Sequence, residues 1–277
     1  MRGKTVVITG ATSGIGEVTA LRLAQQGARI LLTARDQARG DDMLGNLRAV
    51  APGVAHGVFY ADLSRLAEMK RVARELASAT ARIDVLINNA GAVFPKRQFT
   101  EDGLEATFAT NHLAYFVLTA LLVPRLTTGG SARIVNVSSG VHTMDKLDLD
   151  DLQWQRRRYV GFHAYSQSKS CNILFTRELA RRLEGTGVTA NALRPGFVRT
   201  RLFRRSGILM WLPLLWAISP GEGAATTVYL ATSPEVASVS GQFFYKCRLA
   251  TPAPHACSDE NARRLWQISE ELSGLGV

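Results

Sequence analysis

The N-terminal stretch from Lys4 to Gly16 restricts the possible folds more than any other part of the chain. Lys4 to Thr9 is rich in β-branched residues, which is typical of a strand buried on both faces of a parallel sheet. A glycine-rich turn follows over residues 10–16, and a helical pattern of apolar residues then runs up to Gly27. Strand, glycine-rich turn and helix in this order give the context that a dinucleotide-binding site requires.

The turn reads T-G-x-x-x-G-x-G, a longer pattern than the common G-x-G-x-x-G and one less expected by chance. Its glycines allow a tight turn and a close approach of the backbone to a pyrophosphate, which would bind the free N–H groups at the helix N-terminus. A ligand-free loop between strand and helix is the alternative interpretation. We expect cofactor contacts from Gly10, Thr12, Ser13, Gly14, Ile15 and Gly16.

The end of the second expected strand, Arg29 to Thr33, indicates which dinucleotide binds. An NAD site usually places an acidic side chain here, about 20 residues beyond the glycine turn, to bind the ribose 2′-hydroxyl. This chain has Ala34 at that position and Arg35 next, and an arginine would pair instead with a 2′-phosphate. We therefore expect NADP(H). Asp36 would favour NAD(H) if the register were shifted by two residues, and a solvated loop arginine is the other alternative for Arg35.

Strands and helices alternate along the whole chain, without repeats, low-complexity tracts or a linker. This alternation predicts one doubly wound α/β (Rossmann) domain over residues 1–277, with a mostly parallel sheet of seven strands. The further strands are expected at Val54 to Tyr60, Ile83 to Ile87, Arg133 to Val137, Val188 to Leu193 and Gly241 to Tyr245. Helices are expected at about Ser64 to Ala79, Gly103 to Leu126, Tyr165 to Leu183 and Asp259 to Leu272.

Polar and small residues follow two of these strands, where the carboxyl ends of a parallel sheet form a ligand crevice. Asp62 stands where a carboxylate would accept a hydrogen bond from an adenine amino group, although Asp62 or Ser64 would equally cap the next helix. The segment Asn88-Asn89-Ala90-Gly91 closes another strand. Such residues suit close contact between backbone and ligand, and they also simply make turns.

Tyr165 and Lys169 are four residues apart, so a helix would place them one turn from each other on the same face. A phenol normally ionises near pH ~10, and a nearby ammonium lowers that pKa and makes the hydroxyl a working proton carrier. Taken alone, the spacing is more often that of a packed ring beside a solvated charge. Asn111 lies inside an expected helix, where asparagine is unfavourable unless its side chain has a role.

Four separated motifs stand in order along the chain: Thr9 to Gly16, Asn88 to Gly91, Ser139, and Tyr165 to Lys169. In order, spacing and residue type they resemble the short-chain dehydrogenase/reductase family over nearly the whole chain. The stretch from Asn172 to Thr200, with the long insert before Tyr165, looks most like the retinol-dehydrogenase-type branch of that family.

The resemblance implies a role for each matching residue. Tyr165 would be the general acid that protonates the carbonyl oxygen in reduction and the base in the reverse reaction, and Lys169 would lower its pKa and bind the nicotinamide ribose. Ser139, rather than Ser138, would hydrogen-bond the substrate oxygen. Asn111 would hold a water that connects Lys169 to solvent. Further cofactor contacts are expected at Asp62, Leu63, Asn89, Ala90, Gly91, Pro195, Gly196, Val198 and Thr200.

The most apolar stretch of the chain, residues 206–218, follows the last of these motifs. It is broken by proline and too short to cross a bilayer. The resemblance implies a lid at about residues 201–220, with Trp211, Leu212 and Trp216 facing a hydrophobic substrate. The alternatives are packing into the core or a homo-oligomer interface, and shallow membrane docking helped by the arginines that precede the stretch.

Composition excludes several other classes. The formal net charge of +10 comes mostly from arginines spread along the chain, with short clusters at 156–158, 181–182 and 204–205, so we expect a solvated arginine-rich surface. A positive field that attracts a phosphorylated cofactor is the second interpretation, and we expect no nucleic-acid partner. Three cysteines without metal-ligand spacing indicate a reducing compartment and no metal site. The sequence begins without an apolar signal region or hydrophobic anchor, so we expect a cytoplasmic protein, and the missing anchor argues against a retinoid substrate.

The sequence therefore predicts an NADP(H)-dependent oxidoreductase that interconverts a hydrophobic aldehyde or ketone and its alcohol, as a carbonyl reductase or alcohol dehydrogenase. A catalytically silent dinucleotide-binding sensor or scaffold on the same fold is the alternative. Competent residues at all four catalytic positions argue against that alternative.

Overall fold

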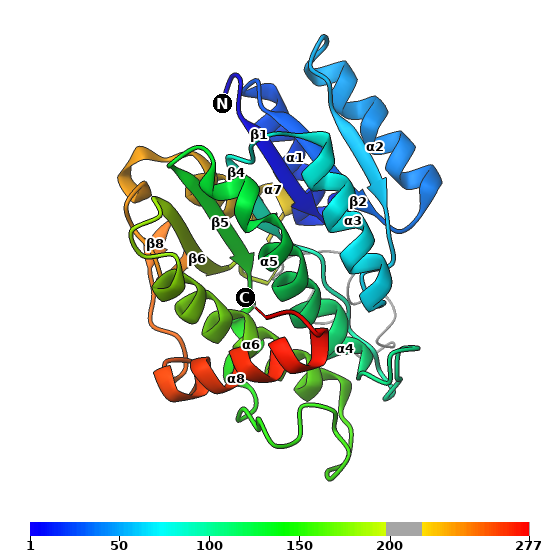
Figure 1. Cartoon of the computed structure of the whole chain (residues 1–277), viewed down its shortest axis with the longest axis vertical. Helices are drawn as coiled ribbons and strands as arrows, with labels where there is room; N and C mark the ends of the chain where they lie inside the picture. The colour runs from blue at the N-terminus through cyan, green and yellow to red at the C-terminus, as the bar shows by residue number, and fades with distance from the viewer. Residues whose placement is uncertain (198–217, 277) are drawn as a thin grey trace.

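One eight-stranded sheet with helices on both faces organises the protein (Figure 1). The structure is a computed structural model and describes residues 1–197 and 218–276. The strand order is β3-β2-β1-β4-β5-β6-β7-β8, and every neighbouring pair is parallel except β7 and β8. The strands are β1 (Thr5–Thr9), β2 (Arg29–Ala34), β3 (Gly57–Tyr60), β4 (Val85–Asn88), β5 (Ala132–Val137), β6 (Val188–Arg194), β7 (Phe243–Tyr245) and β8 (Arg248–Leu249).

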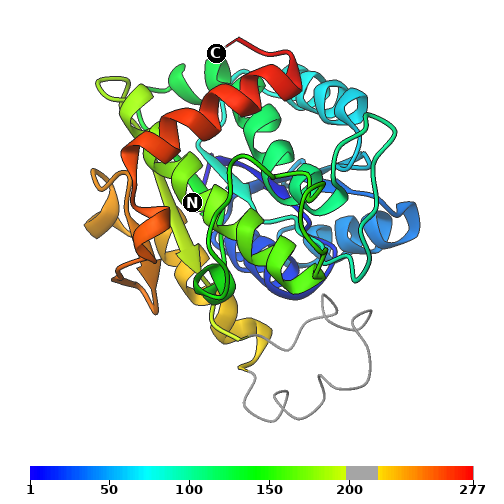
Figure 2. The ribbon, with the colours of Figure 1, turned by 90° about the horizontal axis from the view of Figure 1, so that it is seen from below.

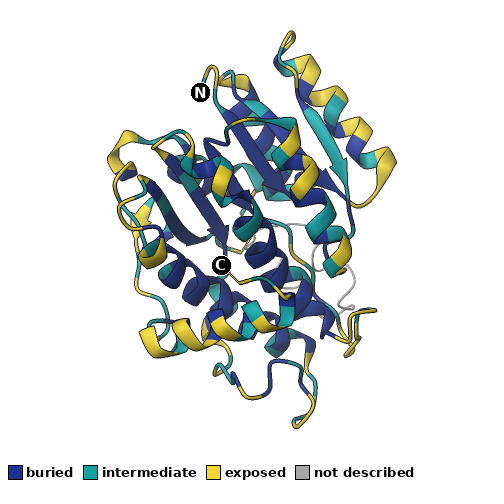
Figure 3. Ribbon diagram, viewed as in Figure 1, coloured by how far each residue is buried: buried dark blue, intermediate teal, exposed yellow. Residues whose placement is uncertain are grey.

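Helices cover both faces of this sheet, which explains why its strands are continuous apolar runs. In β1, Val7 packs into the cluster with α3, α5 and α6, whereas Val6 and Ile8 pack on the opposite face with α1, α2 and α7. The inner strands are accordingly buried along their length (Figure 3). The helices are α1 (Gly14–Gln25), α2 (Gln37–Val50), α3 (Leu66–Ala79), α4 (Ala106–Phe108), α5 (Ala114–Thr127), α6 (Gly161–Arg182), α7 (Pro220–Thr232) and α8 (Asp259–Ser273).

The C-terminal helix α8 lies across α6 on the outside of one helical layer (Figure 2). Its Trp266 stacks on Phe175 of α6, with ring centroids 5.8 Å apart, and meets Phe116 of α5 edge-on at 5.0 Å. The Ser258 side chain caps the first turn of α8, and Gly274 ends it in the left-handed conformation. The last helix therefore completes the core between α5 and α6.

The edge strand β8 has no counterpart among the expected strands, so the prediction of seven strands was wrong by one. A two-residue turn joins β7 to β8, and both of its residues, Lys246 and Cys247, have positive φ (50° and 60°). Hairpin turns of this kind are usually marked by asparagine or glycine. Neither residue type occurs in this turn, so the sequence carries no signal for it.

The long helix expected from Gly103 to Leu126 is interrupted. α4 passes into a π-helical turn over Ala109–Leu113, and α5 begins only after that turn. Asn111 lies within the π-helical turn, a feature frequent at functional sites. Of the described helices, only the combined run Ala106–Thr127 is long and apolar enough to cross a membrane by length and composition. Because 78% of its most apolar window is buried inside the fold, we interpret it as a core helix.

Candidate active site

A cavity of about 550 Å³ lies along the carboxyl ends of the parallel strands. It surrounds the point where the strand order reverses between β1 and β4, which is where open α/β sheets bind ligands. The expected site residues that line it are Gly10, Thr12, Ser13, Gly14, Ile15, Gly16, Arg35, Asp62, Leu63, Asn89, Ala90, Gly91, Ser139, Tyr165, Lys169, Pro195 and Gly196. The other expected contacts, Val198, Thr200, Trp211, Leu212 and Trp216, and most of the expected lid lie outside the described residues.

The glycine turn is tied to the end of β4 by short polar contacts. The Thr9 hydroxyl accepts hydrogen bonds from the backbone N–H groups of Asn89 and Ala90, both at 2.9 Å. The Asn89 side-chain amide donates to the carbonyls of Thr9 (2.9 Å) and Gly10 (3.1 Å). A Cβ on Gly16 would lie 2.4 Å from the Gly10 carbonyl oxygen and 2.5 Å from the Asn89 amide nitrogen, so only glycine fits there.

The N-terminus of α1 presents backbone donors to the same cavity. Ser13 is the N-cap residue, but its side chain makes no capping hydrogen bond. The first N–H groups of any helix have no hydrogen-bond acceptor within the helix, and in α1 the Ser13 side chain does not accept from them either. Such a helix N-terminus binds phosphate groups. The residues present therefore fit the pyrophosphate of a dinucleotide.

Two arginines line the cavity next to the end of β2. The strand ends at Ala34, the expected position, and the exposed Arg35 makes no ion pair or hydrogen bond that involves the described residues. The Asp36 carboxylate caps α2 by accepting a hydrogen bond from the Arg39 backbone N–H at 2.9 Å. The Arg39 guanidinium donates to the Thr12 carbonyl at 3.1 Å. Sequence reasoning missed Arg39, which lies in the first turn of α2, because its place beside the glycine turn depends on how α2 packs against that turn.

Asp62 does not cap a helix, which corrects one alternative left open by the sequence. Its carboxylate accepts hydrogen bonds from the backbone N–H (3.0 Å) and the hydroxyl (2.8 Å) of Ser64, which makes a local turn. α3 starts later, at Leu66, and the Leu66 N–H donates to Asp102 from a distant loop at 2.9 Å. Asp62 thus closes a turn in the wall of the cavity.

Burial controls the protonation of both Tyr165 and Lys169. Burial raises the pKa of Tyr165 to about 12, and a hydrogen bond with the Ser139 side chain partly offsets the rise. Burial also lowers the pKa of Lys169 to about 7. The Lys169 ammonium donates to the Val137 carbonyl at 3.0 Å and lies 5.5 Å from the centroid of the Tyr165 ring. The shift of Tyr165 is opposite to the one expected, because desolvation disfavours the phenolate and leaves the nearby lysine only partly charged.

The two adjacent serines have different surroundings. The buried Ser138 hydroxyl donates to the Lys169 backbone carbonyl at 2.7 Å, so it holds β5 against α6. The Ser139 hydroxyl accepts a hydrogen bond from the Val141 N–H at 3.3 Å and also bonds with Tyr165. Ser139, the residue expected to act on substrate, is therefore the one beside the tyrosine hydroxyl.

Asn111 is the one expected catalytic residue outside the lining of the cavity. Its side-chain oxygen accepts from the Ala92 N–H at 2.7 Å, and its amide donates to the Ala92 carbonyl at 2.9 Å and to Ser168 at 3.0 Å. These bonds fix Ala92, which lines the cavity. A water relay through Asn111 stays a prediction.

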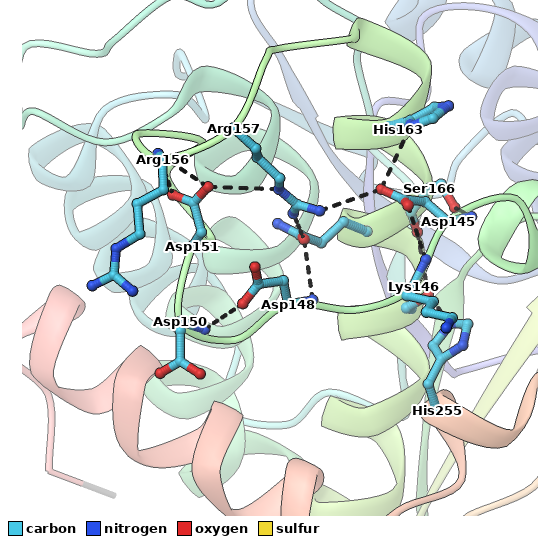
Figure 4. A network of polar contacts seen from close by, with 12 residues as sticks. Asp145, Lys146, Asp148, Asp150, Asp151, Arg156, Arg157, His163, Ser166 and His255 are labelled. Atoms are coloured by element: carbon cyan, nitrogen blue, oxygen red, sulfur yellow. Dashed lines mark hydrogen bonds and ion pairs between the residues drawn. The ribbon is translucent and has the colours of Figure 1, made fainter.

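The insert between Ser139 and Tyr165 is fastened to α6 by Arg157 (Figure 4). The Arg157 guanidinium donates to the side chain of Gln167, lies 3.6 Å from the carboxylates of Asp145 and Asp151, and stacks over Trp154 at 3.7 Å from the ring centroid. The sequence predicted a solvated arginine-rich surface, from which Arg157 departs. It instead anchors the insert to the helix that carries Tyr165.

Apolar side chains form part of the lining of the cavity. Val93, Phe94, Val141 and Phe197 all line the cavity. They come from three separate loops, so no periodic pattern in the sequence could have brought them together.

Several known proteins resemble this chain over most of its length. Residues 4–207 match the family model for short chain dehydrogenases. The chain is 42% identical to human (Homo sapiens) retinol dehydrogenase 13, covering 99% of this chain and 85% of that protein. It is similar to the crystal structure of an uncharacterized protein from Mycobacterium Paratuberculosis, with 35% identity, a TM-score of 0.78, and coverage of 99% and 94% of the two chains. A short-chain dehydrogenase from Sphingobium yanoikuyae in complex with NADPH is 31% identical, with a TM-score of 0.68 and coverage of 81% and 82%.

Proposed function

Because the chain belongs to the short-chain dehydrogenase family, in its retinol-dehydrogenase-like branch, we propose that it is an NADP(H)-dependent oxidoreductase that reduces hydrophobic aldehydes or ketones to alcohols. One observation carries the proposal: a single cavity contains both the glycine turn and the group Ser139, Tyr165 and Lys169. A dinucleotide held by the turn and a carbonyl compound beside Tyr165 would share that cavity.

The residues divide the work between binding and proton transfer. The bound nicotinamide cofactor supplies the hydride chemistry. The glycine turn and the N-terminus of α1 would hold its pyrophosphate, and Asn89 and Ala90, which line the same cavity, would contact its adenosine ribose. Tyr165 donates its proton to the carbonyl oxygen, and Ser139 donates a hydrogen bond to the same atom as negative charge develops there. Lys169 binds the nicotinamide ribose and returns a proton to Tyr165.

The raised pKa of Tyr165 favours the reductive direction. With a pKa of about 12, the hydroxyl keeps its proton throughout the neutral range and is ready to donate it. Oxidation needs the deprotonated form, whose population grows only as the pH rises towards that pKa. The protonated hydroxyl is the form that carbonyl reduction uses.

The apolar wall supports a hydrophobic substrate. Val93, Phe94 and Phe197 line the cavity that contains Tyr165, so the part of the substrate beyond its carbonyl group would contact hydrocarbon and aromatic surface. A lid over about residues 201–220 would add to this surface. We expect these apolar residues to determine which length of substrate hydrocarbon chain the enzyme prefers.

A spectrophotometric screen tests the function. Wild-type protein should oxidise NADPH in the presence of medium-chain or ring-containing aldehydes and ketones, with kcat/KM rising as the apolar part of the substrate grows. The decrease of NADPH absorbance measures the rate. Binding of NADPH without turnover of any carbonyl compound would instead establish the alternative, a catalytically silent sensor.

Replacing Arg35 with aspartate should reverse the cofactor preference. The guanidinium is free to pair with a 2′-phosphate, whereas an aspartate would repel that phosphate and accept from a 2′-hydroxyl. We expect the Kd for NADPH to rise by about 10- to 100-fold, the scale of removing one charge-assisted hydrogen bond, and the Kd for NADH to fall. Fluorescence titration of both cofactors gives the ratio, with Arg48→Gln, an exposed arginine at the other end of α2, as the control. An unchanged ratio would remove Arg35 from the site.

A further inference from the structure

His142 is a buried residue close to Ser139 to which the proposed chemistry assigns no role. Its side chain is 2% exposed and does not line the cavity. The ring lies between two backbone groups: Nδ1 is 2.7 Å from the Ser139 carbonyl oxygen, and Nε2 is 3.0 Å from the Ala253 nitrogen. A ring held at both ends in this way bridges the end of β5 and the segment after β8.

These two contacts determine the tautomer. A backbone N–H can only donate, so Nε2 accepts from Ala253 and carries no proton. Nδ1 must then carry the proton of the neutral ring, and it donates to the Ser139 carbonyl. Burial lowers the pKa of His142, and the nearby His255 and Arg194 lower it further, which keeps the ring neutral.

The C-terminal segment also holds the backbone of His142. His255 Nε2 lies 3.2 Å from the His142 carbonyl oxygen and 3.0 Å from the Ser170 hydroxyl on α6. The ring of Phe243, in β7, meets the imidazole edge-on at 5.3 Å between centroids. His255 lies beside the network that fastens the insert to α6 (Figure 4). His142 is thus fixed by β7, α6 and the Ala253–His255 segment.

Because His142 is fixed, its hydrogen bonds also restrict the backbone of Ser139. Its backbone is extended, with φ −155° and ψ 156°, and its carbonyl accepts from both the ring and the backbone N–H (3.3 Å) of His142. Rotation about ψ of Ser139 would turn the carbonyl away from the imidazole and break the shorter of these bonds. The backbone orientation fixes the direction of the Cα–Cβ bond of Ser139, and the hydrogen bond from the Val141 N–H at 3.3 Å holds the hydroxyl in its rotamer about that bond.

We propose that His142 is a positioning residue for carbonyl reduction, whose Nδ1–H holds the Ser139 backbone so that the Ser139 hydroxyl faces Tyr165. The inference rests on the proposed function, because Ser139 has to act on the carbonyl oxygen. It assigns the segment Ala253–His255 a part in the active site although that segment lies outside the cavity lining. His142 acts through Ser139 and does not touch the substrate.

Two substitutions at His142 distinguish the hydrogen bond made by Nδ1 from the one made by Nε2. His142→Asn places an amide donor near the position of Nδ1 and leaves Ala253 without its acceptor. His142→Gln reaches the position of Nε2 and leaves the Ser139 carbonyl without the ring donor. We expect His142→Gln to lower kcat about tenfold, the scale of removing one hydrogen bond, with the Kd for NADPH unchanged, and His142→Asn to stay within about threefold of wild type.

The measurements are kcat, KM and the Kd for NADPH of each variant, together with its Tm. His163→Asn, which removes a partly exposed histidine outside the cavity lining, controls for loss of an imidazole. Equal kcat in the Asn and Gln variants, or decreases in kcat that follow Tm, would assign His142 a structural role only and overturn the inference. Absence of carbonyl reduction in the wild-type protein is a different result, because it removes the proposed function and the inference with it. Should either variant fail to fold, a Ser139→Ala variant with wild-type kcat would overturn the inference by itself.

Discussion

The variant Tyr165→Phe is expected to lose carbonyl reduction while it keeps its cofactor. The substitution removes only the hydroxyl, so kcat should fall by about 10²- to 10⁴-fold, the contribution of a positioned general acid. The aromatic ring stays packed in its buried site, and the Kd for NADPH should change by less than about twofold, because the remaining dinucleotide contacts are intact. Stopped-flow or steady-state NADPH oxidation measures the first quantity, and fluorescence titration measures the second.

The matched control is Tyr229→Phe. That hydroxyl, on α7, bonds Glu235 at 2.9 Å and lies outside the lining of the cavity. Its removal should leave kcat and Kd unchanged. Loss of a general acid should lower kcat by at least about 100-fold. If Tyr165→Phe kept more than about a tenth of the wild-type kcat, another group would have to donate the proton.

Gly16→Ala is expected to damage the cofactor site before any chemistry takes place. The new methyl group would lie 2.4 Å from the Gly10 carbonyl oxygen and 2.5 Å from the Asn89 amide, so the glycine turn and the end of β4 would have to separate. Overpacking of this kind costs about 1–3 kcal/mol, and the Kd for NADPH should rise by about 10- to 100-fold. Fluorescence titration and thermal unfolding report the two effects.

Gly45→Ala is the control for the same chemical change. Gly45 is exposed on α2, and a Cβ there would meet no atom within 4 Å. Alanine is the better helix former, so this variant should gain about 0.5–1 kcal/mol in stability with an unchanged Kd. A Gly16→Ala protein that bound NADPH as tightly as the control would contradict the close packing at the turn.

The sequence was sufficient for the features that depend on local chemistry. The glycine turn and the end of β2 at Ala34 follow from residue type and spacing. The resemblance to the short-chain dehydrogenase/reductase family implied the position of Ser139, Tyr165 and Lys169, and all three line the cavity. The family assignment is confirmed by the match over residues 4–207. Parallel strands end at one edge of the sheet, so motifs far apart in sequence meet there once the order of strands is fixed.

Features that depend on packing could not be read from the sequence. The sign of the Tyr165 pKa shift was wrong, because it depends on how deeply the phenol is buried and not on its distance from Lys169. The roles of Arg157 and His142 depend on contacts with residues from other elements, such as Trp154 and Ala253. The turn at Lys246 adopts positive φ without the residues that usually mark it. Local spacing carries no information about any of these contacts.

The Thr9 hydroxyl also has a mechanical consequence. It accepts hydrogen bonds from two successive N–H groups, those of Asn89 and Ala90, at the end of β4. It therefore joins the ends of β1 and β4, the two strands between which the strand order reverses. These hydrogen bonds fix the glycine turn against the end of β4, so the dinucleotide-binding part of the cavity is largely preformed. Little further ordering of the protein is then needed when the dinucleotide binds. Adaptation to differently shaped carbonyl compounds then has to come from the loop-borne wall around Val93 and Phe94.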